Sequence, residues 1–466
     1  MPNPNHRSLF NALLWVTFFI IYLIVQFLYG SITQAYFWDE LNVYYRAAEH
    51  LNRFGLGITP DAIPDEFSRG HPILVPFYFG LCFKLFGAFP ITAHIAAALL
   101  SCLGFHFLYR ILSEHIDAVV AFLITLCIFV QPVFLSQSLL LLPEMPLFTA
   151  TAVALYHYQK HNYKFVCLFL MIALQIKESA LVLPPAFILI ELLHRKKLEW
   201  RPVLALFIIP LLSFCLYFTI QYFQKGYFFY PLHTGLTKFD PYFIRERWNE
   251  FKSFAWIEQA HYLFILPALA VLHQYKLISS RLGAFFTIFI VASAFTVLNY
   301  FLSRYTVYFL APFYSYSLYC LYLSFKKQLK LFVPYVVICL IGGIYFWYGN
   351  KFSDTDFTPS SHVKNLHSTL QFLRSPEFKG KTIHIDFPLY ACYMDKHNGY
   401  NTEKSYNTVV GDNHVYDYRV FTFPGNVHDT IKLSTSDTIV KRLSNRYAYT
   451  LIYKKHKTVK DSLLFH

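Results

Sequence analysis

Apolar stretches long enough to cross a lipid bilayer recur through most of this chain and constrain its fold more than any other feature. The first covers residues 9–29, and several later ones approach or exceed the roughly 18–20 apolar residues that a membrane span needs. Charged residues make up 14% of the 466 residues, against about 25% in an ordinary soluble domain. The mean hydropathy is +0.38. These features predict an all-α polytopic membrane protein.

Basic residues gather in short loops, such as residues 194–197 and 326–330, and cytoplasmic loops of membrane proteins are rich in Lys and Arg. Because this distribution is typical of membrane topology, we attribute the formal net charge of +13 to it and expect no nucleic-acid partner. We expect about eleven transmembrane helices in a bacterial inner membrane, which places Asp39 and the C-terminal tail on the extracytoplasmic side. The predicted spans are residues 9–29, 91–112, 118–137, 147–158, 165–175, 180–193, 203–222, 262–275, 282–302, 306–325 and 331–348. Interfacial helices are expected at residues 41–54, 73–86 and 239–254.

The composition becomes polar near residue 351. Residues 363–373 show the pattern of an amphipathic helix, and residues 382–386 and 447–453 show that of strands. We therefore predict a transmembrane catalytic domain over residues 1–350. A small soluble α/β domain over residues 351–466 is expected on the extracytoplasmic side.

Three acidic residues lie where predicted spans would leave the membrane on the outer face. Asp39 and Glu40 follow the first span, and Glu144 lies between two prolines. A carboxylate there can deprotonate an acceptor hydroxyl or amine, or hold a metal ion. Alternatively, Asp39 and Glu144 could cap the helices that follow them. We expect no required cofactor; if a divalent metal binds, Asp39 and Glu144 are its candidate ligands.

Six basic residues are predicted on the same outer face, against the usual charge bias. They are Arg69, His71, Lys177, Arg245, Arg247 and Arg304. An excess of positive charge there favours an anionic partner, and phosphate is the natural one. Neither GxGxxG nor GxxxxGK[ST] occurs, so the expected phosphate donor is a membrane lipid rather than a nucleotide.

Structural roles remain open for five of these basic residues. Lys177 could pair with its neighbour Glu178, and Arg304 could extend to the lipid headgroups. The two arginines of the 239–254 helix could contact lipid, and His71 before a proline could belong to a turn.

These residues lie in segments that resemble the GT-C superfamily of polyprenyl-phosphate-dependent glycosyltransferases. The similarity is greatest to the bacterial branch related to protein O-mannosyltransferases and the aminoarabinose transferase of lipid A. The matching segments, in order over residues 1 to about 350, are Trp38-Asp39-Glu40, Arg69-Gly70-His71-Pro72, Phe83-Lys84-Leu85-Phe86-Gly87, Pro143-Glu144-Met145-Pro146, Lys177-Glu178 and Arg304-Tyr305 leading to Pro312.

The resemblance implies an inverting transfer of a sugar from a polyprenyl-phosphate donor to a lipid, glycan or protein acceptor on the outer face. Asp39 would be the base, and Glu40 would assist it. Glu144 matches a second acidic position, where relatives usually carry Asp. His71 stands where relatives often carry Lys. The cations would stabilise the departing lipid phosphate.

Three other functions remain open. A transporter or flippase of lipid-linked saccharides should carry charges deep within its spans, often with internal repeats, whereas the span centres here are nearly free of charge. An oligosaccharyltransferase or polymer ligase would differ by requiring a metal. A scaffold whose active part is the tail would lose its function when the tail is deleted.

Overall fold

The computed structural model describes residues 4–28, 30–36, 39–195, 200–234, 240–256, 261–271, 283–299, 302–325, 327–349, 359–385, 405–409, 415–423, 437–444 and 449–454. The chain divides into two compact units. The helical unit contains Met1–Ile32, Val43–Gly87 and Thr92–Asn350. The sheet unit contains Thr33–Asn42, Ala88–Ile91 and Lys351–His466. Each unit is described by itself.

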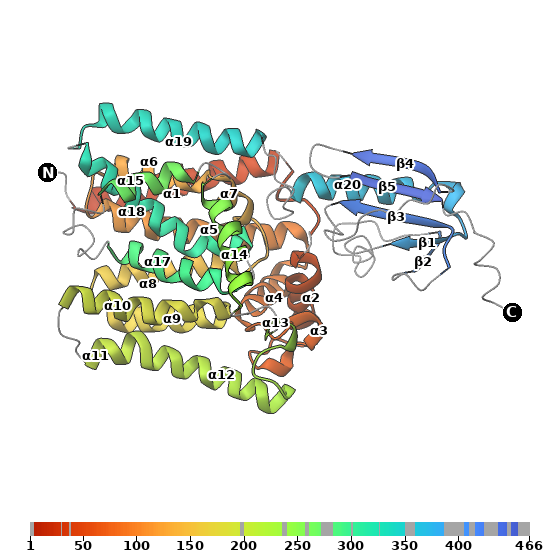
Figure 1. The fold of residues 1–466 in the computed structure, drawn as a ribbon, viewed down its shortest axis with the longest axis horizontal. Helices are drawn as coiled ribbons and strands as arrows, with labels where there is room; N and C mark the ends of the chain where they lie inside the picture. Colours follow the sequence, from red (N-terminus) through yellow and green to blue (C-terminus); the bar gives the residue numbers. More distant parts are fainter. Residues whose placement is uncertain are drawn as a thin grey trace. The chain divides into compact units, whose positions relative to one another are not determined.

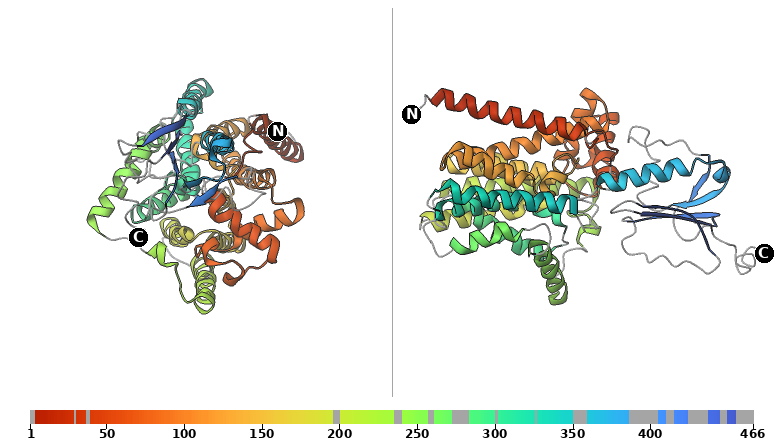
Figure 2. Two further views of the ribbon diagram at one scale, coloured as in Figure 1. Left: turned by 90° about the vertical axis from the view of Figure 1, so that its right-hand side faces the viewer. Right: turned by 90° about the horizontal axis from the view of Figure 1, so that it is seen from above.

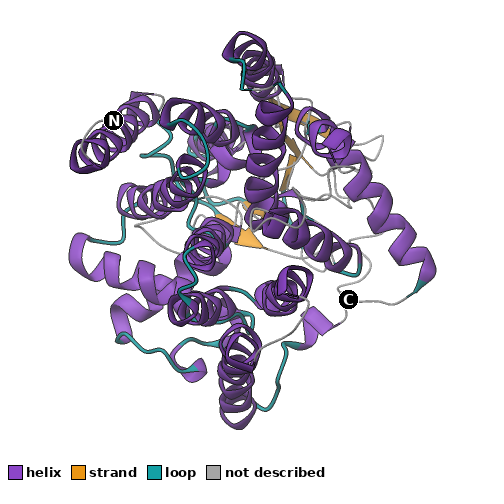
Figure 3. Ribbon diagram, turned by 90° about the vertical axis from the view of Figure 1, so that its left-hand side faces the viewer, coloured by secondary structure: helices purple, strands orange, loops and turns teal. Residues whose placement is uncertain are grey.

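The helical unit is a bundle in which most long helices run roughly parallel or antiparallel, as Figures 1 and 3 show from the side and from one end. The long helices are α1 (Pro4–Leu28), α5 (Pro90–Ser113), α6 (Ala118–Phe129), α8 (Glu144–Gln159), α9 (Tyr163–Ile176), α10 (Leu183–Arg195), α12 (Ile209–Lys225), α14 (Pro241–Trp256), α15 (Tyr262–Val271), α17 (Gly283–Val297), α18 (Val307–Ser324) and α19 (Leu329–Gly349). The other helices of this unit are η1 (Glu40–Tyr45), α2 (Arg46–Phe54), η2 (Pro60–Ala62), α3 (Asp65–Ser68), α4 (Leu74–Phe86), α7 (Pro132–Gln137), η3 (Glu178–Val182), α11 (Trp200–Val203), η4 (Leu204–Ile208), α13 (Pro231–Thr234) and η5 (Ser303–Thr306).

Within the described residues, two helices are both long and apolar enough to cross a bilayer, Pro90–Ser113 and Trp200–Lys225. Shorter apolar helices also occur there, including Ala118–Phe129 and Tyr163–Ile176. Helices therefore occupy the predicted apolar stretches, and the count of eleven spans stays a prediction.

Residues 118–137, predicted as one span, do not form a continuous helix. Helix α6 ends at Phe129, Gln131 has an extended backbone with φ −64° and ψ 142°, and Pro132 begins α7. Proline lacks an N–H donor and disfavours the helical conformation in the residue before it, which explains the break. The non-helical residues 138–143 that follow are buried. Ser101 Oγ satisfies one of their carbonyls by donating to Ser138 O at 2.9 Å.

Two short helices, η2 and α3, lie between α2 and α4. The predicted interfacial helices over residues 41–54, 73–86 and 239–254 correspond to η1 with α2, to α4 and to α14.

The sheet unit contains a five-stranded mixed sheet and the helix α20 (Pro359–Phe372), both visible in Figure 2. The strand order is β2 (Asn407–Val409), β1 (Thr382–Ile385), β3 (Tyr418–Phe423), β5 (Tyr449–Lys454) and β4 (Thr438–Ser444). Strand β1 pairs in parallel with β2 and β3, and the β3–β5 and β4–β5 pairs are antiparallel. Asn365 on α20 donates to Thr450 Oγ1 on β5 at 2.6 Å, which joins helix to sheet. The predicted helix and two strands are present, and β2, β3 and β4 were not predicted.

Candidate functional site

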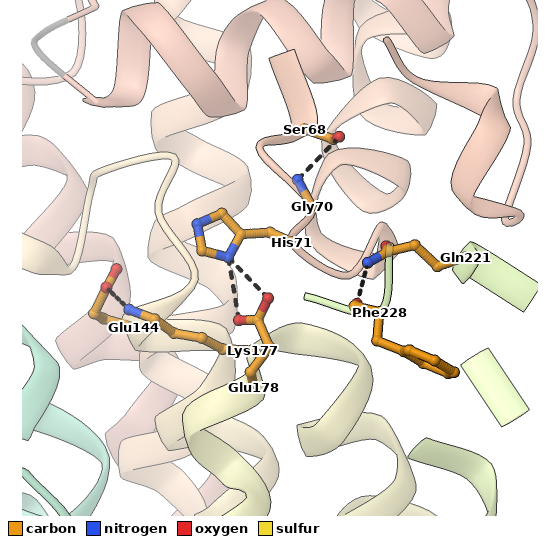
Figure 4. A network of polar contacts seen from close by, with 8 residues as sticks. All are labelled: Ser68, Gly70, His71, Glu144, Lys177, Glu178, Gln221 and Phe228. Atoms are coloured by element: carbon orange, nitrogen blue, oxygen red, sulfur yellow. Dashed lines mark hydrogen bonds and ion pairs between the residues drawn. The ribbon is translucent and has the colours of Figure 1, made fainter. Parts of the chain in front are cut away.

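The helical unit contains a polar cluster that includes the buried carboxylate Glu144, whose contact with Lys177 is drawn in Figure 4. The Lys177 ammonium donates to Glu144 Oε1 at 2.7 Å, and Arg304 Nε lies 3.5 Å from the same oxygen. The side chains of Glu144, Lys177 and Arg304 are 3%, 11% and 4% exposed. Two cations thus surround one carboxylate in the protein interior. The burial of Arg304 excludes the alternative that it extends to lipid headgroups.

Three separate turns bring these charges together. Glu144 is the first residue of α8, Lys177 follows the last residue of α9, and Arg304 lies in η5 just before α18. Helices α8 and α9 pack against each other, as do α8 and α18. Pro146 fits the first turn of α8, because N–H groups there have no intrahelical acceptor. The cluster is therefore a product of helix ends that meet at one end of the bundle.

Lys177 and Glu178 are neighbours in sequence but reach different partners. The backbone at Lys177 is extended, with φ −158° and ψ 142°, and an extended backbone sends successive side chains to opposite sides. Lys177 reaches Glu144, whereas both oxygens of Glu178 lie 3.1 Å from His71 Nδ1 (Figure 4). A carboxylate only accepts, so Nδ1 carries the proton in this contact. Glu178 was not among the predicted site residues.

Two tyrosine rings pack against the basic side chains of the cluster. The Tyr44 ring stacks on the His71 ring, with centroids 6.1 Å apart and an interplanar angle of 19°. Lys177 Nζ lies 3.6 Å from the centre of the Tyr305 ring, and Arg304 Cζ lies 5.4 Å from it. Cations over aromatic faces attract the ring quadrupole, most strongly away from water. Neither tyrosine was predicted as a site residue, although Tyr305 adjoins Arg304 in sequence.

Burial and charge set the ionisation of the cluster, which lies outside the predicted spans. Burial raises the pKa of the Glu144 carboxyl, but the attraction of Lys177 and Arg304 outweighs it, so the pKa is below its ordinary value. Burial lowers the pKa of the Lys177 ammonium, and Glu144 partly opposes that shift. Burial and then the charge of Glu144 hold the pKa of Tyr44 well above its usual range. Glu144 is therefore ionised, and Tyr44 neutral, near neutral pH.

The loop that carries Arg69 and His71 is fixed by contacts outside the cluster. The Asp65 carboxylate accepts from Lys225 Nζ at 2.5 Å and from the Tyr227 hydroxyl at 2.8 Å. Gly70 has φ +71°, and a Cβ there would lie 2.7 Å from Tyr230 Cβ, so this position requires glycine.

Arg69 is half-buried and has φ +45°, a left-handed conformation that is uncommon for residues other than glycine. Its backbone N–H donates to Asp65 O at 2.8 Å. The backbone at Arg69 is therefore held in a conformation that the residue itself disfavours.

Asp39 and Glu40 belong to the sheet unit. Asp39 is half-buried, and Glu40 is buried and begins the π-helical segment Glu40–Tyr45 that also carries Tyr44. π-helical turns are rare and often occur at functional sites. Trp38, part of the predicted motif, lies outside the described residues. The predicted convergence of Asp39 with Glu144 stays a prediction.

The two arginines of α14 have other surroundings. Arg245 is exposed. Arg247 forms an ion pair with Glu250, three residues later on the same helix, and lies over the Phe243 ring at 4.8 Å. Their assignment to the donor phosphate stays a prediction. Among the residues that the structure describes, no group of three or more His, Cys, Asp or Glu side chains is placed to hold a metal ion.

Comparison with known proteins places residues 70–224, which include His71, Glu144 and Lys177, in a match to the family model described as dolichyl-phosphate-mannose-protein mannosyltransferase. The crystal structure of ArnT from Cupriavidus metallidurans bound to undecaprenyl phosphate is similar, with a TM-score of 0.54 and 15% identity over 94% of this chain and 98% of that chain. The resemblance predicted from the sequence is confirmed.

The apo structure of the same ArnT is also similar, with a TM-score of 0.54 and 12% identity over 95% of this chain and 98% of that chain. At these identities the likeness shows a shared fold. Among curated proteins, none matches this sequence.

Proposed function

We propose that this chain is an integral membrane glycosyltransferase that moves a sugar from a polyprenyl-phosphate donor to an extracytoplasmic lipid, glycan or protein, with inversion. The observation that carries the proposal is the buried cluster of Glu144, Lys177 and Arg304. Lys177 and Arg304 place two positively charged side chains beside the Glu144 carboxylate in the protein interior. Basic side chains gathered in one region attract the phosphate of a sugar-phosphate lipid and stabilise it as it departs.

The graded exposure of the cluster supports one direction of entry for the donor headgroup. Glu144 and Arg304 are almost fully buried, whereas the side chains of His71 and Glu178 are 20% and 23% exposed. A charged phosphate loses less hydration energy at the more exposed end. We therefore place the phosphate near His71 and the adjacent half-buried Arg69, and the sugar further inside.

In the proposed reaction, Asp39 accepts a proton from the acceptor hydroxyl or amine. The acceptor atom then forms a bond to the anomeric carbon as the bond from that carbon to the phosphate oxygen breaks. The electron pair stays on the lipid phosphate, which the nearby cations stabilise, so no general acid is needed. A single displacement inverts the configuration. Glu40 assists Asp39, and no cofactor is required.

The test is Asp39→Asn, which keeps the size of the side chain and removes the base. Sugar transfer would be measured in membranes with a panel of radiolabelled polyprenyl-phosphate monosaccharides. We expect transfer to fall about 10²–10⁴-fold, with donor binding retained. The matched control is Asp117→Asn, because Asp117 caps α6 by accepting from Val119 N–H at 2.9 Å. Transfer that survives Asp39→Asn unchanged would remove Asp39 as the base.

The competing functions give different results in the same membranes. A flippase would move the labelled lipid across the bilayer without cleaving its sugar. A metal-dependent ligase would stop when a chelator is added, whereas we expect transfer to continue.

A further inference from the structure

The two carboxylate oxygens of Glu144 differ in their hydrogen bonding. Oε1 accepts from Lys177 and faces Arg304. Oε2 is buried and has no hydrogen-bond partner among the described residues. A buried acceptor without a donor is costly, by roughly 1–3 kcal/mol and more for a charged group. The inner end of the cluster therefore offers an acceptor site that can take a hydrogen-bond donor.

Lys177 offers donors at the same place. Its ammonium has three N–H groups, and one hydrogen bond joins it to Glu144 Oε1. The ammonium also lies against the Tyr305 ring, and its side chain is 11% exposed. The Lys177 ammonium therefore lies beside the Glu144 carboxylate, 2.7 Å from Oε1.

This combination fits a hydroxyl group better than a phosphate. A phosphate diester has acceptor oxygens and no donor, and its negative charge would be repelled by the Glu144 carboxylate. A hydroxyl donates one hydrogen bond and accepts others, and it is neutral, so placing it in a buried site costs less. The sugar hydroxyls and the phosphate of the donor would therefore bind at opposite ends of the cluster.

We propose that Glu144 and Lys177 bind a hydroxyl of the donor sugar, which donates to Glu144 Oε2 and accepts from Lys177 Nζ. The inference rests on the proposed function and deepens it. It makes Glu144 a residue that selects the sugar rather than an acid or base in the reaction. Arg304 then serves to keep Glu144 ionised, and the phosphate lies toward His71.

The experiment compares two lipids on one variant. Wild type and Glu144→Gln, each in lipid nanodiscs, are titrated with sugar-free undecaprenyl phosphate and with the same lipid carrying a monosaccharide that wild type transfers. The variant should bind the sugar-free lipid within about twofold of wild type. Its affinity for the sugar-bearing lipid should fall about 10- to 100-fold, the usual effect of losing a hydrogen bond to a charged group. The control is Glu114→Gln, since Glu114 also pairs with a lysine, Lys160, at 2.6 Å.

Other outcomes would overturn the inference. Equal loss for both lipids would assign Glu144 to organising the phosphate site. Unchanged affinities with slow transfer would assign it to catalysis. If no sugar donor is bound or transferred by wild type, the proposed function itself fails.

A second measurement does not depend on how well the variant folds. Wild type is assayed with donors that lack one sugar hydroxyl at a time. One of these deoxy donors should bind about 10- to 100-fold more weakly than its parent. If every deoxy donor binds as its parent does, the inference is wrong.

Discussion

Replacing Lys177 with methionine tests whether the buried ion pair holds the site together. Methionine keeps most of the length and apolar surface of the lysine but removes the ammonium that donates to Glu144 at 2.7 Å. The Glu144 carboxylate, only 3% exposed, would then lose its nearest counter-charge. Arg304 Nε would remain 3.5 Å from the same oxygen.

The burial of the pair sets the expected magnitude. An exposed ion pair contributes at most about 1 kcal/mol, whereas removing one partner of a buried pair costs about 3–5 kcal/mol. Because Arg304 still compensates part of the charge, we expect a loss near 3 kcal/mol, the lower end of that range. Adding Glu144→Gln to Lys177→Met should cost less than the two single changes combined, by at least about 1.5 kcal/mol.

The assay is thermal unfolding in detergent micelles, followed by the amount of folded monomer that survives heating. The melting temperature of Lys177→Met should fall by roughly 3 °C, because the entropy of unfolding grows with chain length. Lys160→Met is the matched control, because Lys160 pairs with Glu114 at 2.6 Å but its side chain is 46% exposed. We expect its stability to change by less than about 1 kcal/mol. Equal melting temperatures for the two variants would refute the reasoning.

Three further changes test the ionisation and the loop of the site. The pKa of Glu144 is lowered from 4.5, so its ionisation stabilises the fold fully above about pH 4.5, and this contribution is lost as the pH falls through the lowered pKa. The stability of Glu144→Gln, measured by unfolding in acid, should therefore depend less steeply on pH than that of wild type. Arg69→Gly should relieve the left-handed backbone, which raises stability by about 0.5–1 kcal/mol, and should weaken donor binding. The control Lys327→Gly, at φ +62°, should raise stability equally without an effect on binding. Retained donor affinity in Arg69→Gly would contradict a ligand role for Arg69. Gly70→Ala should slow transfer and lower stability by about 1–3 kcal/mol, because the new Cβ would meet Tyr230. The control Gly226→Ala has open space around it and should lower stability by about 1 kcal/mol, through backbone strain alone. Equal melting curves and equal transfer rates for the two variants would contradict this.

Much of the helical architecture follows from local sequence. The apolar stretch predicted over residues 91–112 is the helix Pro90–Ser113, because length and hydrophobicity are properties of the segment itself. The break before α7 also has a local cause, Pro132, whose effect the pattern of apolar residues obscured. Strand β4 was missed because it alternates little and is mostly exposed.

The site was predictable as a set of residues but not as a set of pairs. His71, Lys177, Arg304 and Glu144 were identified by charge at positions where charge is unfavourable. The partners depend on the extended backbone at Lys177 and on how α8 packs against α9, which no local pattern specifies. Arg247 is the opposite case, since the spacing to Glu250 already indicates an intrahelical pair.

The most direct test is a structure of the protein in lipid nanodiscs with a polyprenyl-phosphate monosaccharide bound. We expect the phosphate beside His71 and Arg69, and one sugar hydroxyl within hydrogen-bond distance of both Glu144 Oε2 and Lys177 Nζ. A headgroup bound elsewhere, with the Glu144–Lys177 pair and its surroundings unchanged, would contradict the central claim that this cluster binds the donor.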